Sequence, residues 1–226
     1  MPSLKSLAQL CAESYSRHTI DAGATEAICE VIDGVPHVAV RGSQTTRDWV
    51  RNLDTRLGID PYLGGVHRGF LVAAEELWNC SEFVIWRSAN LRDDGPIYLT
   101  GHSQGGAVAT LLAHWLARDS PFVRLATFGS PRVLSAPAAE RYSWVESHVR
   151  VVHRDDLVPH VPSWRYAHVG TPVYLNTSEL GRDIRTLPAA ISEHLARGGI
   201  LGWWNRGWDD HDISHYVEHS SDTEWP

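Results

Sequence analysis

Several features are scarce in this chain of 226 residues, and each scarcity argues against a class of protein. Cysteine occurs three times, as Cys11, Cys29 and Cys80, without motif spacing, so we expect buried reduced thiols rather than disulfides or metal ligands. Lysine occurs once and the formal net charge is −7, which argues against a nucleic-acid partner because phosphate binding needs a basic surface. The longest apolar runs are far too short to span a membrane.

Metal-binding patterns are also scarce. Neither an H-E-x-x-H nor a C-x-x-C spacing occurs, so we expect no catalytic metal and no cofactor. The first fifteen residues lack a continuous apolar run and a cleavage pattern, and Leu4, Leu7, Ala8 and Cys11 instead fall at helical spacing. The sequence therefore predicts an N-terminal helix and, together with the cysteines, a cytoplasmic location.

The remaining composition is that of a globular protein. Hydrophobic residues make up 43% and charged residues 21% of the chain, and its length suits one α/β domain over residues 1–226. Apolar strand patterns alternate with helical ones, which predicts a mostly parallel sheet with helices on both faces. We expect a hairpin from 27–32 and 37–41, strands at 97–100, 122–128, 149–152 and 169–175, helices at 45–53, 69–89, 107–118 and 187–197, and a less regular segment at 57–66.

The most informative stretch is Gly101-His102-Ser103-Gln104-Gly105. It has the form G-x-S-x-G, follows an apolar strand pattern and precedes a helical one. In that context the serine lies on a sharp turn at a helix N-terminus, where unpaired N–H groups favour developing negative charge. The pattern predicts that Ser103 is a nucleophile.

A nucleophilic serine needs a histidine base and an acid that orients the base. In α/β-hydrolases the acid and then the histidine follow the serine along the chain. Asp155 and Asp156 follow the predicted strand at 149–152 and are both candidates for the acid. His211 and His215 are both candidates for the base.

Five further segments resemble the class 3 lipases, the fungal-type triacylglycerol lipases within the α/β-hydrolases. The resemblance covers nearly the whole chain and implies an α/β-hydrolase fold. It rests on Arg41-Gly42-Ser43 with Asp48-Trp49, Val66-His67-Arg68-Gly69-Phe70, Gly101 to Gly106, Phe128-Gly129-Ser130-Pro131-Arg132-Val133, Asp156-Leu157-Val158-Pro159 followed by His168, and Asp210-His211-Asp212-Ile213 with Tyr216.

The resemblance assigns a role to each candidate. It implies that Ser103 is the nucleophile, His211 the general base and Asp156 the orienting acid, with Asp155 and His215 as the second choices. It also implies an oxyanion hole. One donor is the backbone N–H of Gln104 and the other is Ser43, on the loop after the hairpin.

A lid and an acyl site are expected beside these residues. The predicted helix at 45–53 lies at the family's lid position and presents Trp49, Val50 and Leu53 on one side. Trp203, Trp204 and Trp208 cluster before His211, where they could line the acyl pocket, meet lipid or anchor a loop. The segment at 55–65 is short, which argues against an elaborate lid and strong interfacial activation.

The sequence thus predicts a serine carboxylic ester hydrolase of lipase or esterase type. The expected partner is a lipid or other acyl ester, with transient contact to a lipid surface. A phospholipase and a short-chain or aryl esterase are alternatives within the same class of enzyme. A catalytically silent interaction module is a third alternative, against which stands a competent residue at every triad and oxyanion position.

Overall fold

A seven-stranded sheet forms the centre of the computed structural model, which describes residues 1–23, 25–43, 56–91, 94–120, 122–162, 165–176 and 207–222. The first three strands pair antiparallel and every later pair is parallel, which confirms the predicted mostly parallel sheet. In spatial order the strands are β1 (Ile20–Asp21), β2 (Glu26–Ile32), β3 (Val35–Val40), β6 (Ile97–His102), β7 (Val123–Phe128), β9 (Ser147–His153) and β11 (Thr171–Leu175).

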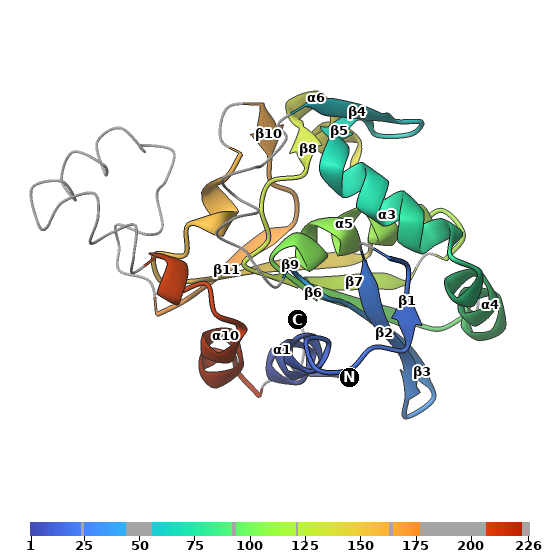
Figure 1. Ribbon diagram of the computed structural model, residues 1–226, viewed down its shortest axis with the longest axis horizontal. Helices are drawn as coiled ribbons and strands as arrows, with labels where there is room; N and C mark the ends of the chain where they lie inside the picture. Colours follow the sequence, from blue (N-terminus) through green and yellow to red (C-terminus); the bar gives the residue numbers. More distant parts are fainter. Residues whose placement is uncertain are drawn as a thin grey trace, which may run out of the picture.

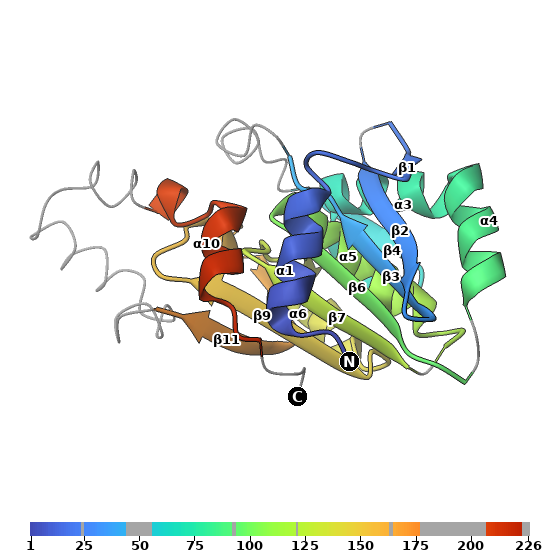
Figure 2. The same ribbon diagram turned by 90° about the horizontal axis from the view of Figure 1, so that it is seen from below.

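Helices cover both faces of this sheet, as the alternating pattern predicted (Figure 1). Helices α1 (Leu4–Glu13) and α10 (Ile213–His219) lie on one face, and α3 (Arg68–Asn79) and α5 (Gln104–Leu116) lie on the other. Every residue of α5 from Gly105 to Leu116 is buried, so this helix is the centre of the larger core. Figure 2 shows α1 and α10 side by side across the strands β6, β7 and β9.

The segment at 57–66 is more regular than expected. It forms a hairpin of β4 (Leu57–Asp60) and β5 (Gly64–His67), which joins β8 (Leu134–Ser135) and β10 (Tyr166–Ala167) in a second sheet. The turn is built on Asp60, whose Oδ1 accepts hydrogen bonds from the N–H groups of Tyr62 and Leu63. Its Oδ2 accepts a bond from Trp115 Nε1 on α5, which ties the hairpin to the core.

The predicted long helix at 69–89 is wrong as one element, because the chain breaks it at Cys80. That residue is extended, with φ −60° and ψ 131°, and separates α3 from α4 (Ser81–Asn90). After the turn, the Arg87 guanidinium lies 3.8 Å from the centre of the Trp78 ring and donates to the Trp78 carbonyl. The break thus packs the start of α4 back against the end of α3, which the helical periodicity alone did not predict.

Three short elements complete the described chain: α6 (Ala136–Arg141), the 3₁₀ turn η1 (Val158–His160) and α10. Helix α10 was not expected as a helix, and it begins at Asp212, whose Oδ1 accepts from the Ser214 N–H as an N-cap. The predicted helices at 45–53 and 187–197 lie outside the described residues. Among the described helices, none is long and apolar enough to cross a membrane.

Candidate active site

Ser103 lies on a strained turn between β6 and α5. Its backbone has φ 56° and ψ −128°, a conformation that costs an L-residue free energy and persists only where the surroundings enforce it. The neighbouring glycines allow the turn. A Cβ on Gly105 would lie 2.7 Å from the Arg41 carbonyl carbon, and one on Gly101 would overlap the backbone of Gly105 and Gly106. The G-x-S-x-G spacing therefore follows from how closely β6, α5 and the end of β3 approach one another.

The two predicted oxyanion donors belong to segments that meet at this turn. Gln104 is the first residue of α5, so its N–H has no preceding helical carbonyl to bond. Ser43 follows Gly42, where a Cβ would lie only 3.2 Å from Ser103 Cβ. The loop that carries Ser43 therefore touches the nucleophile.

Asp156 and His211 form a buried pair beside the serine. His211 Nδ1 lies 2.7 Å from Asp156 Oδ2, and the two residues are 3% and 0% exposed. Asp156 Oδ1 accepts from the Val158 N–H at 2.9 Å, and Oδ2 also accepts from the Tyr216 hydroxyl. The carboxylate is thus held from both sides, and its bond to His211 Nδ1–H fixes the tautomer with its lone pair on Nε2.

His102 stacks on His211 and bonds to its backbone, a contact that the sequence analysis did not predict. The two rings stack with centroids 4.6 Å apart, and His102 Nε2 donates to the His211 carbonyl at 2.8 Å. The Tyr15 hydroxyl donates to His102 Nδ1 at 2.7 Å. Burial, followed by the charge of His211, lowers the pKa of His102 to about 3, so the ring is neutral. Its position directly before Ser103 was the available signal.

Tyr216 is a second residue whose contact was not foreseen. It is fully buried on α10, and its hydroxyl accepts from the His153 N–H while donating to Asp156. Burial and then the Asp156 carboxylate raise the pKa of Tyr216 well above its usual value, so the phenol keeps its proton. The D-H-x-I-x-x-Y pattern contained this residue without showing its partner.

The atoms that would exchange a proton are both available. Ser103 Oγ and His211 Nε2 are buried and have no hydrogen-bond partner among the described residues. Gly129, which follows β7, gives the Asp156–His211 pair its room. Its φ is +57°, and a Cβ there would lie 2.7 Å from Asp156 Oδ2 and 2.9 Å from His211 Nδ1.

The second-choice residues lie elsewhere. The bond to His211 Nδ1 is made by Asp156, and the N–H of Asp155 donates to Asp210 Oδ2 at 3.4 Å. His215 is half-buried on α10 and stacks against His153. Trp208 packs against Leu157 and Val158 directly after the acid. The other residues expected at the lid or acyl site, Trp49, Val50, Leu53, Trp203 and Trp204, lie outside the described residues.

The fold is of the α/β-hydrolase type, and its site brings a serine on a strained turn close to a buried Asp–His pair. The family described as "Lipase (class 3)" matches residues 37–166, which include Ser103 and Asp156. The chain belongs to the class 3 lipase family. The resemblance stated from the motifs is therefore confirmed.

Curated relatives agree with this family, and a solved structure agrees with the fold. The chain is 33% identical over 176 residues to a secreted mono- and diacylglycerol lipase of Fusarium solani, covering 73% of this chain and 52% of the relative. It is 30% identical over 203 residues to one of Penicillium cyclopium, covering 82% and 62%. The triacylglyceride lipase structure of Rhizomucor miehei has a TM-score of 0.66 at 24% identity, covering 76% and 78%. The chain thus spans about half to three fifths of the length of these curated relatives.

The expected cytoplasmic location is contradicted by these relatives, because the Fusarium and Penicillium proteins are both named secreted lipases. The pattern behind the expectation did predict structure correctly, since Leu4–Glu13 forms helix α1 and buries Leu4, Leu7, Ala8 and Cys11. A packed helix fixes local structure and carries no information about the compartment.

Proposed function

We propose that this chain hydrolyses carboxylic esters of lipids through Ser103, His211 and Asp156. The observation that supports this most directly is the buried Asp156–His211 pair, hydrogen bonded at 2.7 Å and adjacent in the fold to a serine on a strained turn. Hydrogen bonds from Val158 and Tyr216 hold the Asp156 carboxylate, and the stacked ring of His102 holds His211. Such preorganisation is what an acyl-transfer site requires.

The reaction follows from these positions. Ser103 Oγ attacks the ester carbonyl carbon while His211 Nε2 takes its proton, and Asp156 stabilises the imidazolium that forms. The Gln104 N–H and Ser43 donate to the oxygen that becomes negative. The intermediate expels the alcohol, which receives the proton from His211. Water then attacks the acyl-enzyme by the same route and releases the acid.

The proposed substrates are mono- and diacylglycerols, the lipids in the names of the Fusarium and Penicillium relatives. A phospholipase A1 activity is the second candidate, since a rice relative named phospholipase A1-II 2 is 29% identical over 226 residues. A panel of monooleoyl, dioleoyl and trioleoyl glycerol and phosphatidylcholine separates the two. Faster hydrolysis of phosphatidylcholine than of every glyceride would reject the first candidate.

The test of the mechanism is Ser103→Ala, with Ser120→Ala as the matched control. Ser120 is also a buried serine, 3% exposed, and follows α5 at the end far from Ser103. We expect Ser103→Ala to lower kcat on a p-nitrophenyl ester about 10⁶-fold while the circular dichroism spectrum is unchanged. Ser120→Ala should retain activity and react with a fluorophosphonate probe. Turnover retained in Ser103→Ala, or labelling of that variant at the same rate, would reject the mechanism.

Three further proposals concern the surroundings of the site. Trp49, Val50, Leu53, Trp203, Trp204 and Trp208 are proposed to cover the site or line the acyl pocket, in transient contact with a lipid surface. Hydrolysis measured across the aggregation threshold of the substrate tests whether these residues cover the site. A rate that rises smoothly with substrate concentration, without an upward break at the threshold, would exclude a gating role.

Residues 1–226 are proposed to form one domain. The names of the relatives support secretion of the protein.

A further inference from the structure

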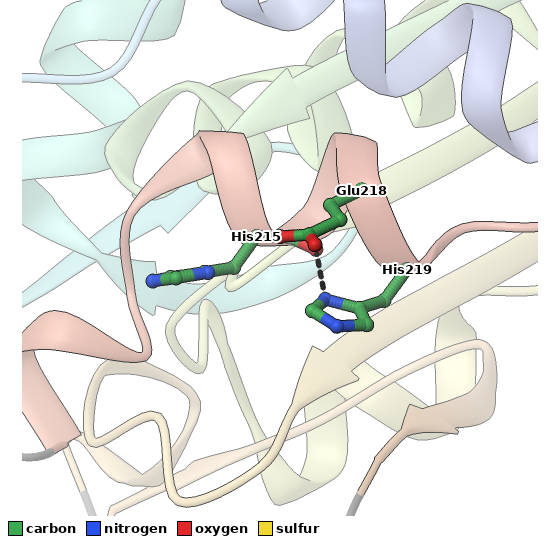
Figure 3. Close-up of side chains that lie close together, drawn as sticks. All are labelled: His215, Glu218 and His219. Carbon is green, nitrogen blue, oxygen red and sulfur yellow. Dashed lines mark hydrogen bonds between the residues drawn. The ribbon is translucent and has the colours of Figure 1, made fainter.

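We propose that His215, Glu218 and His219 on α10 bind one divalent transition-metal ion of the Zn²⁺ class. One ligand atom of each side chain lies within 4.8 Å of the others (Figure 3). Two histidines four residues apart and a glutamate three residues along share one face of a helix. The sequence expectation concerned H-E-x-x-H and C-x-x-C patterns, and His215-x-x-x-His219 matches neither.

The tautomer of His219 suits a metal ligand. Its Nδ1 lies 2.9 Å from the His215 carbonyl oxygen, which can only accept, so Nδ1 carries the proton and Nε2 keeps its lone pair. Histidines that bind metals usually donate their second ring N–H to a carbonyl or carboxylate in this way. The hydrogen bond therefore leaves Nε2 as the atom of His219 that can bind a metal ion.

His153 on β9 holds both ligand rings from the protein side. It is 1% exposed, and its ring centroid lies 5.3 Å from that of His215 and 5.0 Å from that of His219. Its Nδ1 lies 3.1 Å from the Asp210 carbonyl oxygen, while Nε2 is buried without a partner among the described residues.

The ligand set selects the class of ion. Two imidazoles and one carboxylate suit Zn²⁺, Ni²⁺ or Cu²⁺, whereas Mg²⁺ and Ca²⁺ prefer oxygen ligands alone. Metal–nitrogen bonds of about 2.0–2.1 Å bring the ligand atoms of a tetrahedral site about 3.4 Å apart, which needs only small rotations of half-exposed side chains. Three protein ligands leave the fourth position for water.

The other candidate group of the described residues is a weaker site and serves as a control. His18, Asp21 and Glu26 also cluster, but the Glu26 carboxylate already pairs with Arg41, which is itself mostly buried. His18 and Asp21 are exposed on a loop and a two-residue strand rather than on one helix face. Substitution of His18 therefore removes a surface histidine of similar chemistry from a place where we expect no bound ion.

The consequence of binding is stabilisation of α10, the helix of seven residues that follows His211 and carries Tyr216. An ion that bridges its last two turns opposes fraying of that helix. We expect the ion to take no part in ester hydrolysis, because its histidine ligands stack against His153 whereas His211 bonds to Asp156. Binding to the folded state alone raises the Tm as the zinc concentration rises.

The experiment titrates ZnCl₂ into the EDTA-treated, dialysed protein by calorimetry and follows the Tm. We expect one Zn²⁺ per chain, a rise in Tm that EDTA reverses, and no response to MgCl₂. The double variant His215→Gln/His219→Gln should lose both effects, the exposed Glu218→Gln should weaken them, and His18→Gln should retain them. Absence of binding to the wild type, or equal binding to the double variant, overturns the proposal. If the double variant does not fold, unchanged zinc binding by Glu218→Gln overturns it instead.

Discussion

The two halves of the candidate site are held in opposite ways. Asp156 and His211 are fixed by side-chain contacts, because Val158, Tyr216 and His102 each bond or stack with one of them. Ser103 is held by the backbone, through a strained φ of 56° and glycines that let three segments approach. The comparison teaches that the base is oriented by hydrogen bonds and the nucleophile by chain geometry. Variants of each half should therefore fail differently.

Asp156→Asn should cause the largest loss among variants of the acid–base half. An amide can donate to His211 Nδ1 and so favour the wrong tautomer, with the proton on Nε2, which must accept from Ser103. We expect kcat to fall about 10⁴-fold with little change in KM, as in other triads that carry this substitution. The matched control is Asp155→Asn, which changes the neighbouring carboxylate and should leave kcat within a few-fold of wild type. The assignment of the acid is wrong if the control loses the activity instead.

The contrast also explains which parts of the site the sequence could predict. The elbow depends on contacts between neighbouring residues, so the G-x-S-x-G pattern and its strand and helix were visible from spacing alone. The choice of Asp156 over Asp155 needed the family motif, because one residue along an extended chain turns the side chain to the opposite side.

The contacts of His102, Tyr15 and Tyr216 could not be predicted in the same way. His102 meets Tyr15 across 87 residues and Tyr216 meets Asp156 across 60, and no periodicity reports such pairs. The mostly parallel sheet followed from alternating strand and helix patterns, whereas the break at Cys80, which brings Arg87 over the Trp78 ring, did not. Local pattern thus predicted the nucleophile half, and tertiary packing determined the support of the base.

Gly129→Ala should break the acid–base half through sterics without removing any functional group. A methyl group there would lie 2.7 Å from Asp156 Oδ2 and displace the Asp156–His211 pair. We expect kcat to fall about 10²-fold, the loss typical of an ångström-scale misplacement of a catalytic group. Gly34→Ala is the control, since Gly34 also has positive φ, +80°, but a Cβ there meets nothing within 4 Å. Both variants should lose about 1–2 kcal/mol of stability from backbone strain. Equal kcat values in the two variants would show that the space at Gly129 is not needed.

Tyr216→Phe should have the smallest effect on activity and is the sharpest probe of the hydrogen bonds around the acid. It removes one donor to a buried carboxylate and keeps the ring that packs against His102 and Phe128. A hydrogen bond to a charged group contributes about 1.5–3 kcal/mol to stability. Only the part of this free energy that also stabilises the transition state affects the rate, so we expect loss of the bond to lower kcat about tenfold.

Tyr98→Phe is the matched control. Tyr98 lies on β6, the strand that leads to Ser103, and is similarly buried at 1% exposed. Its hydroxyl also bonds to a charged group, since it accepts from Arg124 at 3.1 Å. Both substitutions should lower the free energy of unfolding by a similar amount, as urea denaturation would measure. Only Tyr216→Phe should lower kcat, since only that hydroxyl bonds to the residue that orients His211. If the two variants lose stability alike and neither loses kcat, Tyr216 stabilises the fold without positioning Asp156, and the acid must then be held by the Val158 N–H and His211 alone.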